Sequence, residues 1–337
     1  SWNEPRPFPQ EDGDMRKFPR RGAWLLMFAI GGGHAAATYP ERPLRIVVPF
    51  APGGVADATA RLIAAEMSEE LGQSVVVENR AGGAAIIGTT LVAKAPADGY
   101  TLLLGSTNIS TNPALYKKLP YDADKELTPV ALAVVVPGVI VTHPSVPARN
   151  LPDLVQYARR NPDKLSYSSV GLGSFSHLAV ERLAQQTSTK VVHVPYKGYA
   201  PAIMSVISGE THFLISDLQG ALPYIKAGKL NAMAVTGNKR LAVLPDVATA
   251  QEAGLKDYEA VGWLGIMAPA GTPQPVIARL NAIVNKAMRR QDVSQRYLEQ
   301  GSETFDGSPQ DFRRFLDENR RGWEQVIRAG GITVDAS

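Results

Sequence analysis

The chain has 337 residues, which exceeds the size that one hydrophobic core usually serves, so two domains are expected. Hydrophobic residues make up 45% and charged residues 20%, the net charge is +3, and there is no basic stripe interleaved with aromatic residues that would favour a nucleic-acid partner. The absence of cysteine excludes disulfides, thiolate metal ligands and cysteine nucleophiles.

The N-terminal part of the sequence has the pattern of an export signal. A basic segment, 15–21, precedes the apolar run 23–30, and an A-x-A cleavage pattern ends at Ala37. The apolar run is too short to span a bilayer, which takes about 20 residues. We interpret 15–37 as a signal peptide that is removed and 1–14 as an N-terminal extension of unknown role. A buried N-terminal helix is the alternative.

From the first apolar run onward, short apolar stretches alternate with segments of helical spacing, which favours βα units and largely parallel sheets. Proline or glycine stands at nearly every junction. The first part of the chain is expected to form strands at 44–48, 75–77 and 101–104 and helices at 56–71 and 86–95.

A second cycle of the same pattern begins near residue 139. It is expected to form strands at 139–141, 165–168, 191–194, 213–215 and 230–235 and helices at 151–160, 177–186 and 201–207. A strand at 263–268, a long helix ending at Arg290 and an amphipathic helix at 309–328 follow. We therefore expect two α/β lobes with a ligand cleft between them: lobe 1 from 38–138 plus 260–337, and lobe 2 from 139–259.

The bend after the first strand, PFAPGGVAD, is a candidate ligand site. Gly53 and Gly54 lack Cβ, so a ligand can approach the backbone closely, and the next helix presents free N–H groups that can receive an anion. Asp57 can cap that helix or orient a water molecule. An ordinary glycine turn is the alternative.

A second bend, SSVGLGSFSH at 168–177, also leads from a strand into a helix. Its serine hydroxyls and backbone amides can form a neutral carboxylate or phosphate receptor. Helix capping by Ser174 or Ser176 is the alternative. Two such bends, one in each lobe, predict a ligand clamped between the lobes.

Three further stretches can complete the cleft. Lys197 offers a charge partner, although a lysine in a turn is usually solvated. Asp217 can cap a helix or accept a hydrogen bond from a ligand amine or hydroxyl. Ser106, Thr107 and Asn108 follow a strand of lobe 1 and are similar candidates.

Enzymatic readings have little support in the sequence. The stretch from Gly171 to Ser176 is an imperfect dinucleotide motif, and there is no phosphate-binding G-x-x-x-x-G-K-[ST] and no G-x-S-x-G nucleophile elbow. The histidines do not cluster in the sequence, and one His177–Glu181 pair makes no metal site. We expect no catalysis, no metal and no cofactor.

Several stretches carry a family resemblance, among them YPERPLRIVVPFAPGGVAD, APADGYTLLLGS, LSYSSVGLGSFSHL, VVHVPYKG and ALPYIKAGKLNAMAVTG. Over about 39–332 the chain resembles the extracytoplasmic solute receptors of the tripartite tricarboxylate transporter family, the Bug-type receptors. The resemblance implies a type II periplasmic binding protein, in which two α/β lobes close on a ligand like a Venus flytrap. It also implies export to the periplasm and delivery of the ligand to a two-component membrane permease.

The resemblance implies ligand contacts as well. It assigns one ligand carboxyl group to the first bend and supplies hydroxyls and amides from the second. With the positions named above, the expected ligand-binding residues are Phe50, Gly53, Gly54, Ala56, Asp57, Ser106, Thr107, Ser169, Gly171, Ser174, Ser176, Lys197, Gly198 and Asp217. Ile86 stands where many relatives have asparagine, and 106–112 has its own pattern, so the identity of the substrate cannot be copied from a relative.

The sequence thus predicts a monomeric periplasmic receptor that captures a small organic carboxylate for a permease of the tripartite tricarboxylate type. Hinge closure near 138–142 and 258–262 would report ligand binding as a change of shape. Two alternatives remain open: a sensory receptor that presents a carboxylate to a signalling partner, and an enzyme on the same scaffold.

Overall fold

The computed structural model describes residues 39–334. The expected extension at 1–14 and signal peptide at 15–37 lie outside the described residues, and so do residues 335–337. Within the described part, no helix combines the length and the apolar character that crossing a membrane requires.

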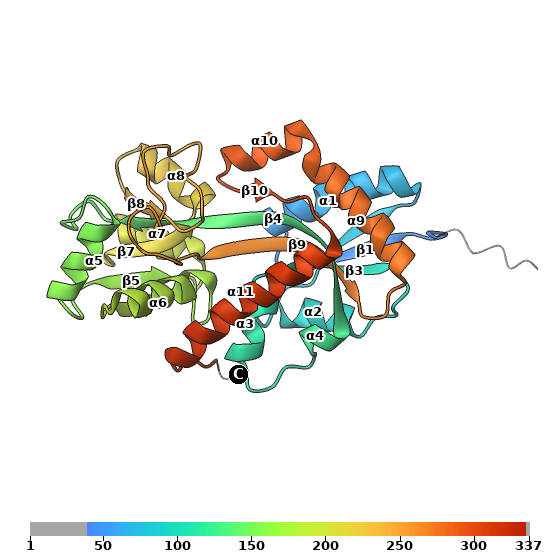
Figure 1. Ribbon diagram of the computed structural model, residues 1–337, viewed down its shortest axis with the longest axis horizontal. Helices are drawn as coiled ribbons and strands as arrows, with labels where there is room; N and C mark the ends of the chain where they lie inside the picture. Colours follow the sequence, from blue (N-terminus) through green and yellow to red (C-terminus); the bar gives the residue numbers. More distant parts are fainter. Residues whose placement is uncertain (1–38, 335–337) are drawn as a thin grey trace, which may run out of the picture. The chain divides into compact units, whose positions relative to one another are not determined.

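The first part of the chain forms βα units with parallel strands (Figure 1). It contains β1 (Leu44–Val48), α1 (Val55–Leu71), β2 (Val75–Asn79), α2 (Ile86–Ala93), β3 (Thr101–Ser106), α3 (Asn108–Leu115) and α4 (Ala123–Glu126). Strand β1 lies between β2 and β3 and is parallel to both, with Ile46 opposite Val77 and Leu102. The carboxyl ends of these three strands therefore meet at one edge of the sheet, where the bends that follow them gather.

The second part repeats the alternation. It contains α5 (Leu151–Arg160), β5 (Ser166–Ser169), α6 (Phe175–Thr187), β6 (Val192–Pro195), α7 (Tyr199–Ile207), β7 (Phe213–Asp217), α8 (Leu218–Lys226) and β8 (Asn231–Val235). Strand β5 is parallel to β6 and to β7. The bends after β5, β6 and β7 therefore also share one edge.

A long strand, β4 (Leu127–Thr142), belongs to both groups of strands. It pairs antiparallel with β9 (Val261–Pro269) as far as Pro137, which lies opposite Val261, and with β7 from Gly138 onward. The strand order is β2-β1-β3-β9-β4-β7-β5-β6. The chain therefore passes from one group to the other at Pro137 and Gly138, within a continuous strand (Figure 1).

The C-terminal elements are α9 (Gln274–Arg289), α10 (Gln291–Glu299), β10 (Glu303–Thr304) and α11 (Pro309–Ala329). Helix α11 begins with a capping box between Ser308 and Asp311. It buries Phe312 with Trp263 in the core of the first group, and Trp323 with Leu178 in the core of the second. The amphipathic C-terminal helix thus packs on both cores, whereas the sequence assigned the whole of 260–337 to lobe 1.

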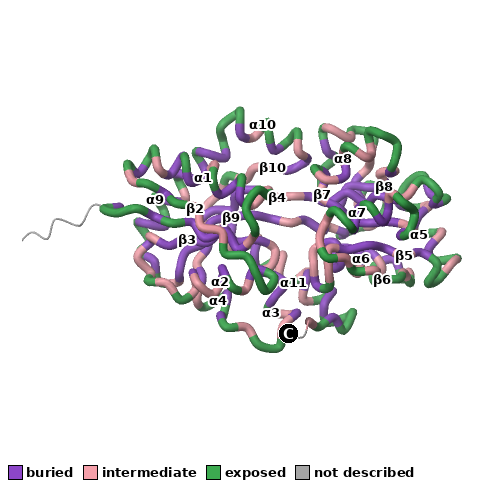
Figure 2. Tube along the Cα trace, turned by 180° about the vertical axis from the view of Figure 1, so that it is seen from behind, coloured by how far each residue is buried: buried purple, intermediate pink, exposed green. Residues whose placement is uncertain are grey.

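Burial follows the layers (Figure 2). The central strands are buried, whereas β2, β6 and β10 are partly exposed. The helices that cover the strands turn exposed faces outward. Ile46, Leu104 and Ile266 are fully buried in the first core, and Tyr167, Ile215 and Leu178 in the second. Removing this apolar surface from water holds each group of strands to its own helices.

Candidate functional site

Two cavities lie on opposite faces of the ribbon formed by β4 and β9. Val135 and Val136 are neighbours on β4, and because side chains alternate along a strand they face different cavities. We call the cavity beside Val135 the rear cleft and the cavity beside Val136 the front cleft.

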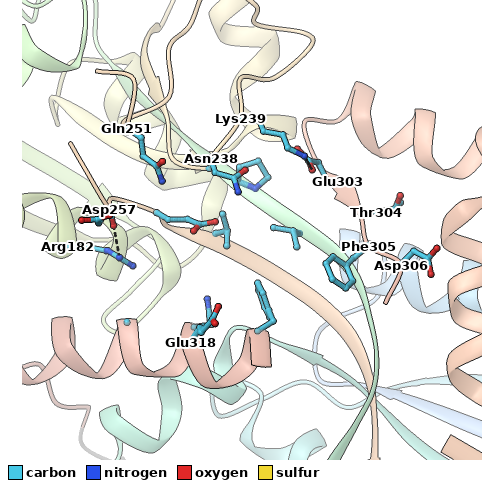
Figure 3. A pocket seen from close by; sticks show the side chains of 18 residues that line it. Arg182, Asn238, Lys239, Gln251, Asp257, Glu303, Thr304, Phe305, Asp306 and Glu318 are labelled. Carbon is cyan, nitrogen blue, oxygen red and sulfur yellow. Dashed lines mark hydrogen bonds and ion pairs between the residues drawn. The ribbon is translucent and has the colours of Figure 1, made fainter. Parts of the chain in front are cut away.

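The rear cleft has a volume of about 750 Å³ and is shown in Figure 3. Its charged lining residues are Arg182, Lys239, Asp257, Glu259, Glu303, Asp306 and Glu318. Lys239 pairs with Glu303 at 3.1 Å, and Arg182 donates to the carbonyl oxygen of Asp257 at 3.1 Å. Because acidic side chains outnumber basic ones here, the rear cleft disfavours anions.

The front cleft has a volume of about 450 Å³ and is lined from both groups of strands. From the first group it takes Phe50, Ala51, Gly54, Val55, Ala56, Ser106, Thr107 and Asn108, and from β4 and β9 Val136, Pro137, Gly262, Trp263 and Leu264. From the second group it takes Val170, Phe175, Ser176, Tyr199, Ile215, Ser216, Asp217 and Gln219, and Gln300 and Ser302 complete it. A cavity with an apolar interior and a few polar groups at its walls is typical of small-ligand sites.

The start of α1 forms one wall of the front cleft. Gly54 is its N-cap, and no side chain in the described part of the protein caps this end. The first helical hydrogen bond runs from the amide of Ala58 to the carbonyl oxygen of Gly54, so the amides of 55–57 have no partner within the helix. These groups carry partial positive charge, and the cavity reaches them at Gly54, Val55 and Ala56. This wall can receive an anion without a basic side chain.

Asp57 holds this wall in place and does not line the cleft. Its carboxylate accepts hydrogen bonds from the amide of Gly53, from Arg61 and from Asn79, each at 3.0 Å. Asn79 also donates to the carbonyl oxygen of Phe50 at 3.1 Å. The Arg61 guanidinium, followed by the Gly53 amide, lowers the pKa of Asp57 to about 2. The carboxylate therefore stays ionised and fixes the bend from behind.

The bend after β3 adds polar groups from the same side. Ser106 donates to the side-chain oxygen of Asn108 at 3.2 Å, which leaves the NH₂ group of Asn108 available as a donor. The hydroxyl of Thr107 accepts from the amide of Trp263 at 3.3 Å. This bond ties the bend to β9, so Thr107 helps to shape the wall.

The serine- and glycine-rich bend after β5 uses most of its polar groups internally. The hydroxyl of Ser169 lies 2.6 Å from Nε2 of His193 and accepts from the amide of Gly171, and Ser174 caps α6 through the amide of His177. Ser176 accepts from the amide of Val170 at 3.1 Å. These bonds make the bend rigid and leave Ser176 as the predicted residue of this bend that reaches the cavity.

A buried histidine, His177, and a partly buried one, His193, support this bend. The rings of His177 and His193 stack with centroids 4.2 Å apart, and Nδ1 of His177 accepts from the amide of Gly173 at 3.0 Å. Burial lowers the pKa of each to about 4. Both rings are therefore neutral at physiological pH.

The structure divides the predicted ligand residues into two sets. Those that line the front cleft are Phe50, Gly54, Ala56, Ser106, Thr107, Ser176 and Asp217. Those outside the lining are Gly53, Asp57, Ser169, Gly171, Ser174, Lys197 and Gly198. Several of the second set make hydrogen bonds within the bends that carry the first set, and their contact with a ligand stays a prediction.

Sequence reasoning did not identify several lining residues, including Tyr199, Phe175, Gln219, Trp263 and Gln300. A signal was present for Tyr199, because it follows the VPYKG bend at another strand-to-helix junction. Among the described residues, no group of three or more His, Asp or Glu side chains is arranged to hold a metal ion.

Comparison with known proteins identifies the family. Residues 59–332 match the family model described as tripartite tricarboxylate transporter family receptor. The chain belongs to this receptor family. A protein described as "UPF0065 protein in tcbD-tcbE intergenic region" of Pseudomonas sp. (strain P51) is 41% identical to the receptor over 290 residues, which is 86% of each chain.

Solved structures agree with this assignment. R. palustris Rpa4515 with adipate is 38% identical, covers 88% of the receptor and 100% of its own chain, and has a TM-score of 0.77. MatC (Rpa3494) from Rhodopseudomonas palustris with bound malate is 34% identical, covers 86% and 100%, and has a TM-score of 0.73. The receptor has the two-lobed α/β fold of periplasmic solute-binding proteins, and its family and solved neighbours are solute-binding proteins. The predictions of fold class and family are confirmed.

Proposed function

We propose that this receptor captures a small organic carboxylate in the front cleft and delivers it to a two-component permease of the tripartite tricarboxylate type. The observation that carries the proposal is the uncapped N-terminus of α1, which opens into a cavity lined from both lobes. An anion at these amides satisfies groups that have no hydrogen-bond partner among residues 39–334. Relatives whose structures contain adipate and malate support a carboxylate ligand.

Binding would proceed in two steps. The carboxylate first docks at Gly54, Val55 and Ala56 on lobe 1, and residues of lobe 2 such as Ser176 then add contacts as the lobes close about Pro137 and Gly138. Only a ligand that bridges both walls favours the closed form, because a population shift needs different affinities for the two states. In this proposal the receptor is exported, loses 15–37, and works as a periplasmic monomer without catalysis.

The test is thermal unfolding of the purified receptor against a panel of organic acids, with sugars as controls. A ligand that binds the folded state raises the free energy of unfolding by about 2.7 kcal/mol at 100 times its dissociation constant. A rise in Tm confined to carboxylates supports the proposal. If native mass spectrometry shows the cleft to be empty and no acid shifts Tm, the proposal is wrong.

Delivery to the permease needs a separate measurement. Uptake of the labelled acid into membrane vesicles that contain the permease should require added receptor. If uptake is equally fast without the receptor, the proposal of ligand binding stands but the proposal of delivery to the permease is wrong.

A further inference from the structure

The charges of the front cleft are unusual for an anion receptor. Among the lining residues within 39–334 there is no Arg, Lys or His, and Asp217 is the only acidic side chain. The anion-binding wall at α1 and Asp217 belong to different lobes, so a bridging ligand meets donors at one wall and a carboxylate at the other.

The hydroxyl groups beside Asp217 are oriented by their own hydrogen bonds. Ser216 Oγ donates to the carbonyl oxygen of Asp217 at 2.6 Å, which uses the single proton of the serine. Tyr199 is hydrogen-bonded to the same Ser216 oxygen, so the tyrosine must be the donor of that bond. Tyr199 is left with lone pairs only. Toward a ligand it acts as an acceptor.

Asp217 itself adds acceptor capacity. Its Oδ1 accepts from the amide of Gly220 at 2.7 Å as the N-cap of α8, and this bond uses a donor that would otherwise be free at the start of the helix. We call Tyr199, Ser216 and Asp217 the acceptor wall. Gln219, also in the lining, can both donate and accept and carries no charge.

The acceptor wall is held in one arrangement by packing. A Cβ at Gly220 would overlap the ring of Tyr199, so the ring lies directly against the backbone of α8. Asp217 is only partly exposed, and burial raises the pKa of its carboxyl group. A second anion placed there would be poorly screened by water.

We propose that the acceptor wall selects ligands whose second end is a hydrogen-bond donor, a hydroxyl or an ammonium group, and disfavours dicarboxylates. The inference rests on the proposed function, since the first carboxylate must sit at α1. It assigns Asp217 as a specificity-determining residue. It also separates this receptor from the relatives whose structures contain adipate and malate.

The experiment measures dissociation constants by calorimetry on the full chain near neutral pH. The probes are hexanoate, 6-hydroxyhexanoate, 6-aminohexanoate and adipate, which share a carbon chain and differ at one end, together with the matched four-carbon set. We expect the hydroxy or amino acid of a set to bind at least about tenfold more tightly than the dicarboxylate. Adipate or succinate binding as tightly as its hydroxy analogue would overturn the inference.

Asp217→Asn is the test variant, because asparagine keeps the N-cap acceptor and removes the charge. The ratio of the dissociation constant of the dicarboxylate to that of the hydroxy or amino acid should fall by at least about fivefold, mainly because the dicarboxylate binds more tightly. Glu318→Gln is the matched control: it removes a carboxylate from the rear cleft, away from both predicted hinge segments, and should leave the preference unchanged. An unchanged preference in Asp217→Asn, with Tm maintained, also overturns the inference. A complete lack of binding by every acid would instead contradict the proposed function itself.

Discussion

The hydroxyl of Thr236 lies 2.7 Å from the amide nitrogen of Gly138, at the residue where β4 leaves one group of strands for the other. The same hydroxyl donates to the carbonyl oxygen of Ala260 at 2.5 Å. Backbone bonds join the same residues, from Thr236 to Gly138 at 2.8 Å and from Ala260 to Thr236 at 3.0 Å. Thr236 is fully buried and thus ties together the two segments that cross between the lobes.

Thr236→Val should destabilise the receptor by about 1–3 kcal/mol, because it keeps the side-chain volume but leaves buried backbone groups of Gly138 and Ala260 short of a partner. Urea unfolding measures the change. Thr142→Val is the matched control on β4, since that buried hydroxyl has no hydrogen-bond partner among the described residues. It should be neutral or stabilising. Equal losses in the two variants would contradict the role of Thr236.

Gly54→Val should abolish most ligand binding while leaving Tm nearly unchanged. Gly54 has φ −88° and ψ 177°, which valine adopts readily, and an added Cβ meets no protein atom within 4 Å. The new side chain therefore occupies the cavity at the α1 wall. We expect the dissociation constant of the bound acid to rise at least about tenfold in calorimetry.

Gly53→Ala is the contrasting variant. Gly53 has φ +91°, which alanine adopts only with strain of about 1–3 kcal/mol, although there is space for its Cβ. This variant should lose stability in urea unfolding. If Gly54→Val binds as tightly as the parent, the α1 wall does not hold the ligand.

Local patterns predicted much of the fold. The strand 44–48 and the helix 151–160 match the structure to the residue, because apolar runs, caps and breakers act locally. The first part of β4 was missed, since Pro129 and Pro137 argue against a strand. The structure accommodates Pro129 where the register with β9 shifts. Such an irregularity depends on the partner strand, which the sequence pattern does not show.

The candidate site was predictable at its bends but not in its details. Strand-to-helix junctions with glycine and serine pointed to the start of α1 and to the bend after β5. Whether a polar group of a bend is available to a ligand depends on partners that are distant in the sequence. The hydroxyl of Ser169, for example, is hydrogen-bonded to His193, 24 residues away. The ring of Tyr199 reaches the cavity because Gly220 leaves room for it. The hydrophobic periodicity of the sequence does not indicate such a contact between two residues that are far apart in the chain.

Gly220→Ala should weaken ligand binding because it displaces Tyr199 from α8. An alanine inside a helix normally gains about 0.5–1 kcal/mol over glycine, and here the clash offsets that gain. Gly322→Ala is the control in α11, where the added Cβ meets Arg182 at an ordinary 3.5 Å and the usual gain is expected. Calorimetry and urea unfolding on both variants make the comparison. Unchanged affinity in Gly220→Ala would show that the position of Tyr199 does not matter.

The stability of the receptor should fall as the pH falls from 7 to 5. Burial lowers the pKa of His177 and His193 to about 4, whereas an unfolded histidine has a pKa of about 6.5. Between these values the unfolded state binds more protons than the folded state, so the free energy of unfolding decreases with decreasing pH. The loss should be on the order of 1–2 kcal/mol for the buried His177 by pH 5, and smaller for His193, which is partly exposed to solvent.

His193→Gln isolates this effect, because glutamine can still bond to Ser169 but does not titrate in this range. The variant should lose less Tm than the parent between pH 7 and pH 5, even if it is less stable at pH 7. Equal slopes in the parent and in His193→Gln would mean that protonation at His193 does not drive the acid sensitivity. In that case the folded protein would have to accept a proton on the stacked pair of His177 and His193 as easily as the unfolded chain does.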